Sequence, residues 1–161
     1  MITKDDYANV IAMEHGILIK QIEDLTHEDS LIQPQPGGNC MNWVMGHLVG
    51  ALVYIMDVLG AEPPPGIPDL AHYGHASEPV ECDGPGVVNF HELVDTYGLL
   101  TNAITERLAQ MSAADFDEEI DSFFGKVRRG HAALFYFFHK AYHIGQLEQL
   151  RNLAGKTDKV L

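Results

Sequence analysis

The amino-acid sequence predicts an all-α protein, a bundle of four helices. Three observations support this fold class: four segments repeat apolar residues at helical spacing, Pro- and Gly-rich segments separate them, and no segment shows the alternation of a convincing strand. The 161 residues suit one domain, 1–161, which is long enough to bury a core.

The first two predicted helices lie before residue 60. Within residues 5–25, apolar residues recur at intervals of three, four or seven, which is the pattern of one buried helical face. The Pro- and Gly-rich segment 33–38 then interrupts this pattern. Asn39 is expected to cap a second helix over about residues 41–59, and Gly60 is expected to end it.

The other two predicted helices follow a long linker. Residues 61–88 contain most of the prolines, so no long element is expected there, and a loop of this length in a compact domain is often functional. Asn89 and Glu92 can form a capping box at the start of a third helix, which runs to about Met111. The last helix, about residues 130–153, is the most aromatic of the four.

Charge and cysteine usage exclude several classes of partner. Ten Lys and Arg against 23 Asp and Glu give a formal charge of −13, which repels nucleic acid and anionic membrane surfaces, so neither is an expected partner. The chain opens on an amphipathic stretch and no apolar segment is expected to approach membrane-spanning length, which favours the cytoplasm. Cys40 and Cys82 are expected to be reduced thiols, because their spacing matches neither a disulfide framework nor a zinc motif.

Three histidines on the predicted helices form the candidate functional site. His139 and His143 stand four residues apart, so their side chains stack on one helical face and can reach the same ion. Such a pair alone is more often part of a hydrogen-bonded core. His47 is a third polar ring on an otherwise apolar helix, and burying each such group without compensation costs about 1–3 kcal/mol. Three such rings in one small bundle favour a shared divalent metal ion.

Three residues near these histidines are candidates for supporting the ligands or contacting a substrate. Trp43 lies about one helical turn before His47, while Tyr142 is adjacent to His143 and Gln146 lies about one turn after it. Packing on the helix surface is the alternative role for Trp43 and Tyr142.

Other residues near the predicted site receive structural interpretations. Glycine costs a helix interior about 1 kcal/mol relative to alanine. Gly46, Gly50 and Gly145 therefore indicate the close approach of a helix or a ligand, or an ordinary helix crossing. His15 is interpreted as a core histidine, and the remaining histidines receive no metal role: His27, His72, His75, His91 and His131.

Two motifs resemble those of the DinB/YfiT-like family, also called the DinB superfamily. Residues 34–48, PQPGGNCMNWVMGHL, resemble the motif of its second helix, and residues 139–147, HKAYHIGQL, resemble that of its last helix. The resemblance implies a four-helix bundle with a long crossover loop between the second and third helices. It also implies one divalent ion bound by His47, His139 and His143, and a homodimer. Members of the family include thiol-dependent transferases and isomerases and metal-dependent hydrolases.

The leading functional hypothesis is a metal-dependent enzyme of the transferase or hydrolase type. Three imidazole ligands leave coordination positions open, so zinc or nickel, or else iron or copper, could activate a thiol or water to attack a small electrophile. The expected partners are a small-molecule substrate and a low-molecular-weight thiol. Lys140 follows the first histidine of the last-helix motif, where zinc proteases of the His-Glu-x-x-His type carry glutamate, so peptidase activity is disfavoured.

Two other hypotheses come from different functional classes. One is a non-catalytic metal-binding or stress-related helical bundle that functions as a dimer, in which the ion only stabilises the fold. The other is a plain helical dimerisation module whose histidines bind no metal.

Overall fold

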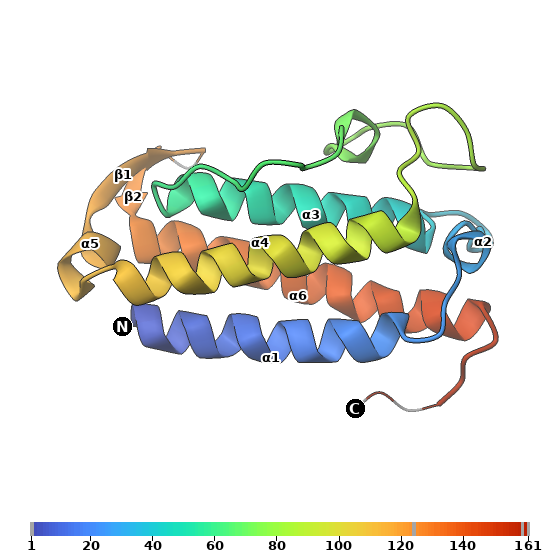
Figure 1. Cartoon of the computed structure of the whole chain (residues 1–161), viewed down its shortest axis with the longest axis horizontal. Coiled ribbons are helices and arrows are strands. Elements are labelled where there is room, and N and C mark those ends of the chain that lie inside the picture. The colour runs from blue at the N-terminus through green and yellow to red at the C-terminus, as the bar shows by residue number, and fades with distance from the viewer. Residues whose placement is uncertain (1, 124, 159, 161) are drawn as a thin grey trace.

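The computed structural model describes residues 2–123, 125–158 and 160 and confirms the all-α bundle (Figure 1). Its four long helices lie close to their predicted bounds: α1 (Lys4–Ile22), α3 (Met41–Val58), α4 (Phe90–Gln110) and α6 (Arg129–Leu153). Each of them buries one apolar stripe against the others, which is why helical periodicity predicts them well.

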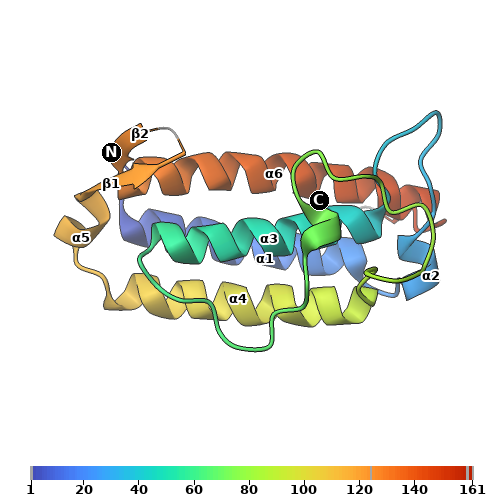
Figure 2. The same ribbon diagram turned by 90° about the horizontal axis from the view of Figure 1, so that it is seen from above.

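The four helices form a ring in which each contacts two neighbours, in the order α1, α4, α3, α6. Helices α3 and α4 run in the same direction, so the chain must return along the bundle between them, and it does so through a loop that crosses over α3 (Figures 1 and 2). This arrangement confirms the predicted crossover. One turn of 3-10 helix within the loop, η1 (Ala71–Tyr73), packs on α3.

Four short elements were not predicted. Helices α2 (His27–Ser30) and α5 (Ala113–Asp117) are single turns in the linkers. Strands β1 (Glu119–Ser122) and β2 (Gly125–Arg128) form an antiparallel hairpin just before α6, so the expectation that the chain contains no strand was wrong. The strands are short and mostly exposed, and for that reason they carry no apolar alternation that the sequence could reveal.

Two predicted helix caps differ from those observed. The residue that precedes α3 is Cys40 rather than Asn39, and no side chain of the described residues caps this end. Asn89 caps α4 as expected, because its side-chain oxygen accepts a bond of 3.0 Å from the backbone N–H of His91. No reciprocal bond from Glu92 completes a capping box among the described residues. Burial of the apolar faces therefore fixes the start of α3 without a side-chain cap.

A buried ion pair fixes how α6 is turned about its axis. The side chain of Lys140 is 0% exposed and its Nζ donates to Glu14 Oε2 of α1 at 2.8 Å. Removing one partner of such a pair costs about 3–5 kcal/mol, because the other charge stays buried. With Lys140 directed at α1, the adjacent His139 is turned toward α3. The pair thereby helps to position the candidate site.

Helix α3 is long and apolar enough to cross a membrane by length and composition, so the expectation that no segment reaches this size was wrong. Within the bundle, however, 72% of Met41–Val58 is buried. This is the burial of a core helix that packs between α4 and α6 and is covered by the crossover loop.

Candidate metal centre

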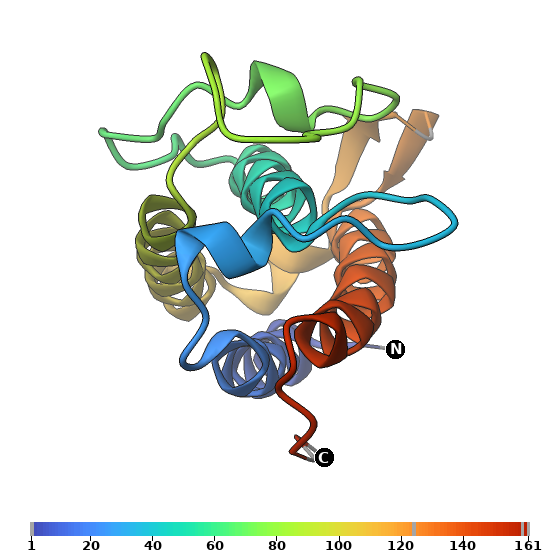
Figure 3. The same cartoon turned by 90° about the vertical axis from the view of Figure 1, so that its right-hand side faces the viewer.

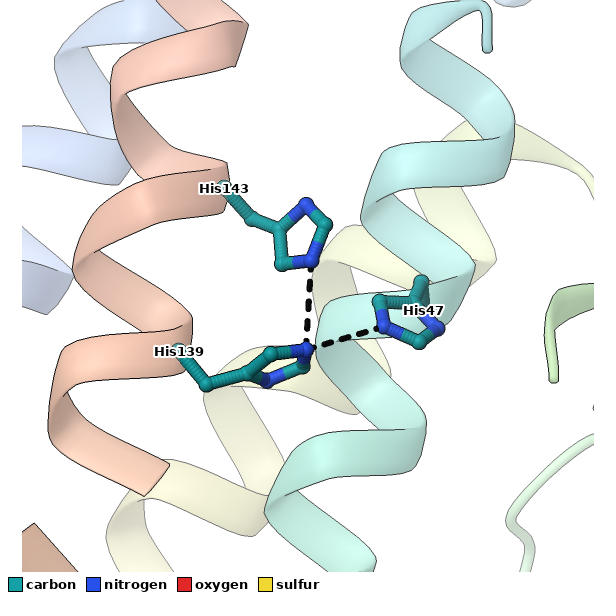
Figure 4. A group of neighbouring side chains, drawn as sticks. All are labelled: His47, His139 and His143. Carbon is teal, nitrogen blue, oxygen red and sulfur yellow. Dashed lines mark hydrogen bonds between the residues drawn. The ribbon is translucent and has the colours of Figure 1, made fainter. Parts of the chain in front are cut away.

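The three predicted histidines meet between the antiparallel neighbours α3 and α6. His139 Nε2 lies 3.1 Å from His47 Nε2 and 3.2 Å from His143 Nε2 (Figure 4). One ligand atom from each ring fits within a span of 4.8 Å. His47 and His139 are 92 residues apart in the sequence, so this convergence is a result of the tertiary fold.

Hydrogen bonds set the tautomers of two of these rings. His47 Nδ1 lies 2.7 Å from the Tyr73 carbonyl oxygen, which can only accept, so Nδ1 donates its proton. His143 Nδ1 donates in the same way to Gln146 Oε1 at 2.7 Å. In both rings Nε2 therefore carries a lone pair that points into the cluster. Metal-binding histidines are commonly oriented by bonds of this kind.

His139 cannot satisfy both of these lone pairs. Its Nδ1 is buried and has no hydrogen-bond partner among the described residues. Its Nε2 lies within 3.2 Å of both neighbours but can donate at most one proton. At least one of the two lone pairs is then left without a donor, and a cation between the rings would satisfy it.

The spacing of the three nitrogens also suits a divalent ion. Zinc–nitrogen bonds of about 2.0–2.1 Å in a tetrahedral arrangement give nitrogen–nitrogen separations of about 3.4 Å. The two short separations in the cluster, 3.1 and 3.2 Å, lie close to this value. On both chemistry and spacing, the group could hold one metal ion.

The electrostatics of the cluster keep the rings neutral. Burial is the main cause that lowers the pKa of all three histidines below the usual value. For His139, burial together with the nearby His143 and His47 lowers the pKa to about 4. Neutral imidazole is the form that binds metal, so near pH 7 the cluster is ready to do so without losing protons.

The three predicted neighbours lie against the cluster. The Trp43 ring stacks on His47 with a centroid separation of 4.7 Å and an interplanar angle of 13°, and its Nε1 donates to Ser77 Oγ at 2.9 Å. The Tyr142 ring meets His143 edge-on at 5.1 Å but is largely exposed. Gln146 forms the bond to His143 already described.

Tyr73 is a supporting residue that the sequence analysis missed. Its carbonyl orients His47, while its hydroxyl donates to Asn42 Oδ1 at 2.9 Å and accepts from the Val88 N–H at 2.8 Å. A Cβ on Gly46 would overlap the Tyr73 ring, so the close approach suggested by this glycine is to the loop. A lone aromatic residue in a Pro-rich loop opposite a helical glycine is the signal that could have identified it.

The other glycines and His15 do not contact the cluster in this way. A Cβ added at Gly50 or Gly145 meets no atom within 4 Å, so close packing explains neither of them. His15 stacks on Tyr97 of α4 at 5.8 Å, which is the expected packing role, but its buried Nδ1 has no hydrogen-bond partner among the described residues.

A cavity of about 950 Å³ opens beside His47 and His139. Its size is typical of small-molecule sites. Four parts of the fold enclose it: α3, α6, the crossover loop and the β1–β2 hairpin, the last two of which lie on the side of the bundle that carries α3 and α6 (Figure 3). The crossover loop therefore both orients a candidate ligand and forms one wall of the cavity.

Comparison with known proteins agrees with this architecture. A search of curated proteins found no significant match. The family model described as the DinB superfamily matches residues 15–147, a range that contains all three histidines and the whole of both motifs, residues 34–48 and 139–147. Because this match covers most of the chain and agrees with the helical fold, the protein belongs to the DinB superfamily.

Proposed function

We propose that the protein is a metal-dependent enzyme of the transferase or hydrolase type, which activates a thiol or water for attack on a small electrophile. The observation that carries the proposal is the convergence of three neutral imidazoles, His47, His139 and His143, beside a cavity of about 950 Å³. Three protein ligands leave a position open for water or substrate, which is the arrangement of catalytic rather than structural zinc.

The surrounding residues would prepare the site for this chemistry. When bound, a zinc or nickel ion would supply a Lewis acid that lowers the pKa of a coordinated water or thiol; iron and copper also suit imidazole ligands. The Tyr73 carbonyl and Gln146 hold two of the rings in the binding tautomer. Trp43 covers one face of His47 and keeps water from it.

The main alternative is a non-catalytic metal-binding or stress-related bundle. A fourth protein ligand would favour this alternative, because it would close the coordination sphere. Among the described residues the group consists of three side chains, with no fourth His, Cys, Asp or Glu. An adjoining cavity also has no evident use in a purely structural site. Both observations favour the enzyme.

As the setting of this enzyme we propose the cytoplasm, where small thiols are kept reduced.

Adding a small thiol to the metal-loaded protein tests whether the site is open. With one equivalent of nickel bound, a thiol such as 2-mercaptoethanol is expected to produce a near-ultraviolet charge-transfer absorption, because a thiolate occupies the free position. The zinc-loaded protein is the spectroscopic control and should show no such band. Nickel that stays bound while no thiol concentration produces the band would favour the structural alternative.

We also propose that the protein functions as a homodimer through an exposed face of α6. On this helix Phe138 is 68% and Tyr142 60% exposed, and Leu134 and Phe135 are partly exposed beside them. Contiguous exposed apolar side chains of this kind are typical of interaction surfaces. Because Phe135 and Tyr142 also contact the rings of His139 and His143, such an interface would lie next to the metal site.

Phe138→Glu is expected to convert this dimer to a monomer, because the new carboxylate would be buried at the interface. Light scattering at micromolar concentrations measures the change. Met13→Glu, an equally drastic change at an exposed apolar residue of α1, is the control and should leave the dimer intact. A wild-type protein that is monomeric, or a Phe138→Glu variant that remains dimeric, would contradict the proposed interface.

A further inference from the structure

The cavity beside the metal centre is elongated along α3 and α6. Its lining on α3 extends from His47 to Val58, and its lining on α6 from Arg129 to His139. Because an α-helix rises 1.5 Å per residue, the step from His47 to Asp57 corresponds to about 15 Å. Helices α3 and α6 are antiparallel (Figure 2). Asp57 and Arg129 therefore line the end of the cavity away from the histidines. A ligand that reaches both ends must be an extended molecule.

The floor of the cavity is open because its residues are small. Gly50, Ala51 and Ala132 line the cavity from the two facing helices. A Cβ built on Gly50 meets no atom within 4 Å, so the space in front of this residue is free. Glycine at this point costs the helix about 1 kcal/mol relative to alanine, and a volume kept free for a ligand explains that cost.

Aromatic rings form one wall of the cavity. Tyr54 of α3 and Tyr136 of α6 stack with a centroid separation of 6.3 Å and an interplanar angle of 13°, and Phe135 lies beside Tyr136 at 5.5 Å. All three line the cavity, and Tyr54 is well exposed. Surfaces of this kind bind apolar and aromatic groups, and tyrosine faces also attract cations.

The charges of the lining favour a cation over an anion. Asp57 and Asp121 contribute carboxylates, and the Asp57 side chain has no hydrogen bond or ion pair among the described residues. Asp57 lies near the Tyr136 hydroxyl, whose pKa is raised by burial first and by Tyr54 and Asp57 in addition. Apart from histidines, Arg129 is the one cationic side chain that the described lining contains.

Arg129 is not free to bind an anionic ligand. Its Nη2 donates to the Glu118 carboxylate at 2.7 Å and its Nε donates to the Asp115 carbonyl at 2.9 Å, while Nη1 donates to the Val58 carbonyl. The guanidinium therefore holds α3, α5 and the hairpin together at this end of α6, and Glu118 balances its charge. An anion at the Asp57 end of the cavity, away from the histidines, would face this carboxylate without a free cationic side chain among the described lining residues.

We propose that the cavity binds an organic cation with an apolar, preferably aromatic, body. Its ammonium group lies between Asp57 and the faces of Tyr54 and Tyr136, its body lies over Gly50, and its other end reaches the histidines. Identifying this ligand as the substrate rests on the proposed function, whereas binding itself follows from the shape and charge of the cavity.

Three probes that share a phenylbutyl body and differ in the charge of the head group test the preference for a cation. They are 4-phenylbutyltrimethylammonium, 4-phenylbutanol and 4-phenylbutanesulfonate, whose head groups are weak zinc ligands, and their affinities for the zinc-loaded protein are measured by calorimetry. The ammonium probe is expected to bind about three- to tenfold more tightly than the alcohol, and the sulfonate most weakly. Asp57→Asn should abolish the advantage of the ammonium probe and leave the affinity of the alcohol unchanged. A sulfonate that binds as tightly as the ammonium probe, or an unchanged preference in Asp57→Asn, would overturn the proposal.

A pair of substitutions at Gly50 locates the probes. Gly50→Leu places a side chain in the open volume and is expected to weaken all three probes more than about tenfold, since their bodies would lose that space. Gly50→Ala adds one methyl group and should retain most of the binding. Undiminished binding in Gly50→Leu would mean that the probes lie elsewhere.

The zinc content of each sample separates the two proposals. A protein that holds zinc but shows no preference for the cation refutes only this inference. A protein that prefers the cation but retains no metal refutes the proposed function instead.

Discussion

His143→Ala is expected to abolish metal binding, with a loss of affinity of more than about 100-fold. Removing a residue that only hydrogen-bonds to a metal ligand typically lowers metal affinity about 10–100-fold. Here one of the three ligands is itself removed, so the loss should be larger. Metal analysis of protein purified without chelators should give about one ion per chain for the wild type and none for the variant.

Trp43 supplies a second measurement of the same loss. It is the only tryptophan, and its ring stacks on His47 at 4.7 Å. Paramagnetic nickel or copper should therefore quench its emission strongly in the wild type and weakly in His143→Ala, while diamagnetic zinc should change it little.

His131→Ala is the matched control for this experiment. This histidine is exposed on the same helix, eight residues before His139, and lies outside the cluster. The variant should keep both the metal and the quenching. Equal metal content and equal quenching in the wild type and in His143→Ala would mean that the ion binds elsewhere and would refute the assigned site.

Gly46→Ala is expected to destabilise the protein and to weaken metal binding, although alanine is the better helix former. The new Cβ would overlap the Tyr73 ring, so the loop must move away from α3. Overpacking of this kind typically costs about 1–3 kcal/mol, which outweighs the helix gain of about 1 kcal/mol. The displaced Tyr73 carbonyl would no longer orient His47, and metal affinity should fall about 10–100-fold. Thermal unfolding and metal titration measure the two effects.

Gly50→Ala controls for the helix effect alone. Gly50 lies one turn after Gly46 on α3, and its added Cβ meets open space. This variant should therefore gain up to about 1 kcal/mol in stability and bind metal as the wild type does. If Gly46→Ala gave the same result as Gly50→Ala, Tyr73 would not be the residue that holds His47 in place.

Most of the fold can be predicted from local patterns. The bounds of α1, α3, α4 and α6 follow from apolar periodicity, because each helix buries one stripe against its neighbours. The β1–β2 hairpin could not be found in this way, since its strands are short and mostly exposed. Apolar periodicity could not show that the face around Phe138 is exposed, because an exposed apolar stripe and a buried one have the same composition.

The candidate site was also predicted in its central residues. His47, His139 and His143 were identified because polar rings on apolar helices need a partner, and the structure brings their nitrogens together. Trp43 and Gln146 were identified as neighbours, because helical spacing places them one turn from a ligand. Tyr73 was missed, because its position depends on the path of an irregular loop, for which no periodicity exists.

The sequence by itself determined which residues are helical, which helical faces are apolar and which histidines need a ligand, because all three depend on neighbours within a few residues along the chain. Only the tertiary structure decided where the crossover loop lies, that the Tyr73 carbonyl bonds to His47 and that a long cavity with Asp57 at its far end opens beside the histidines. These features arise from contacts between residues distant in sequence, and such contacts are set by how the helices pack rather than by the pattern within any one of them.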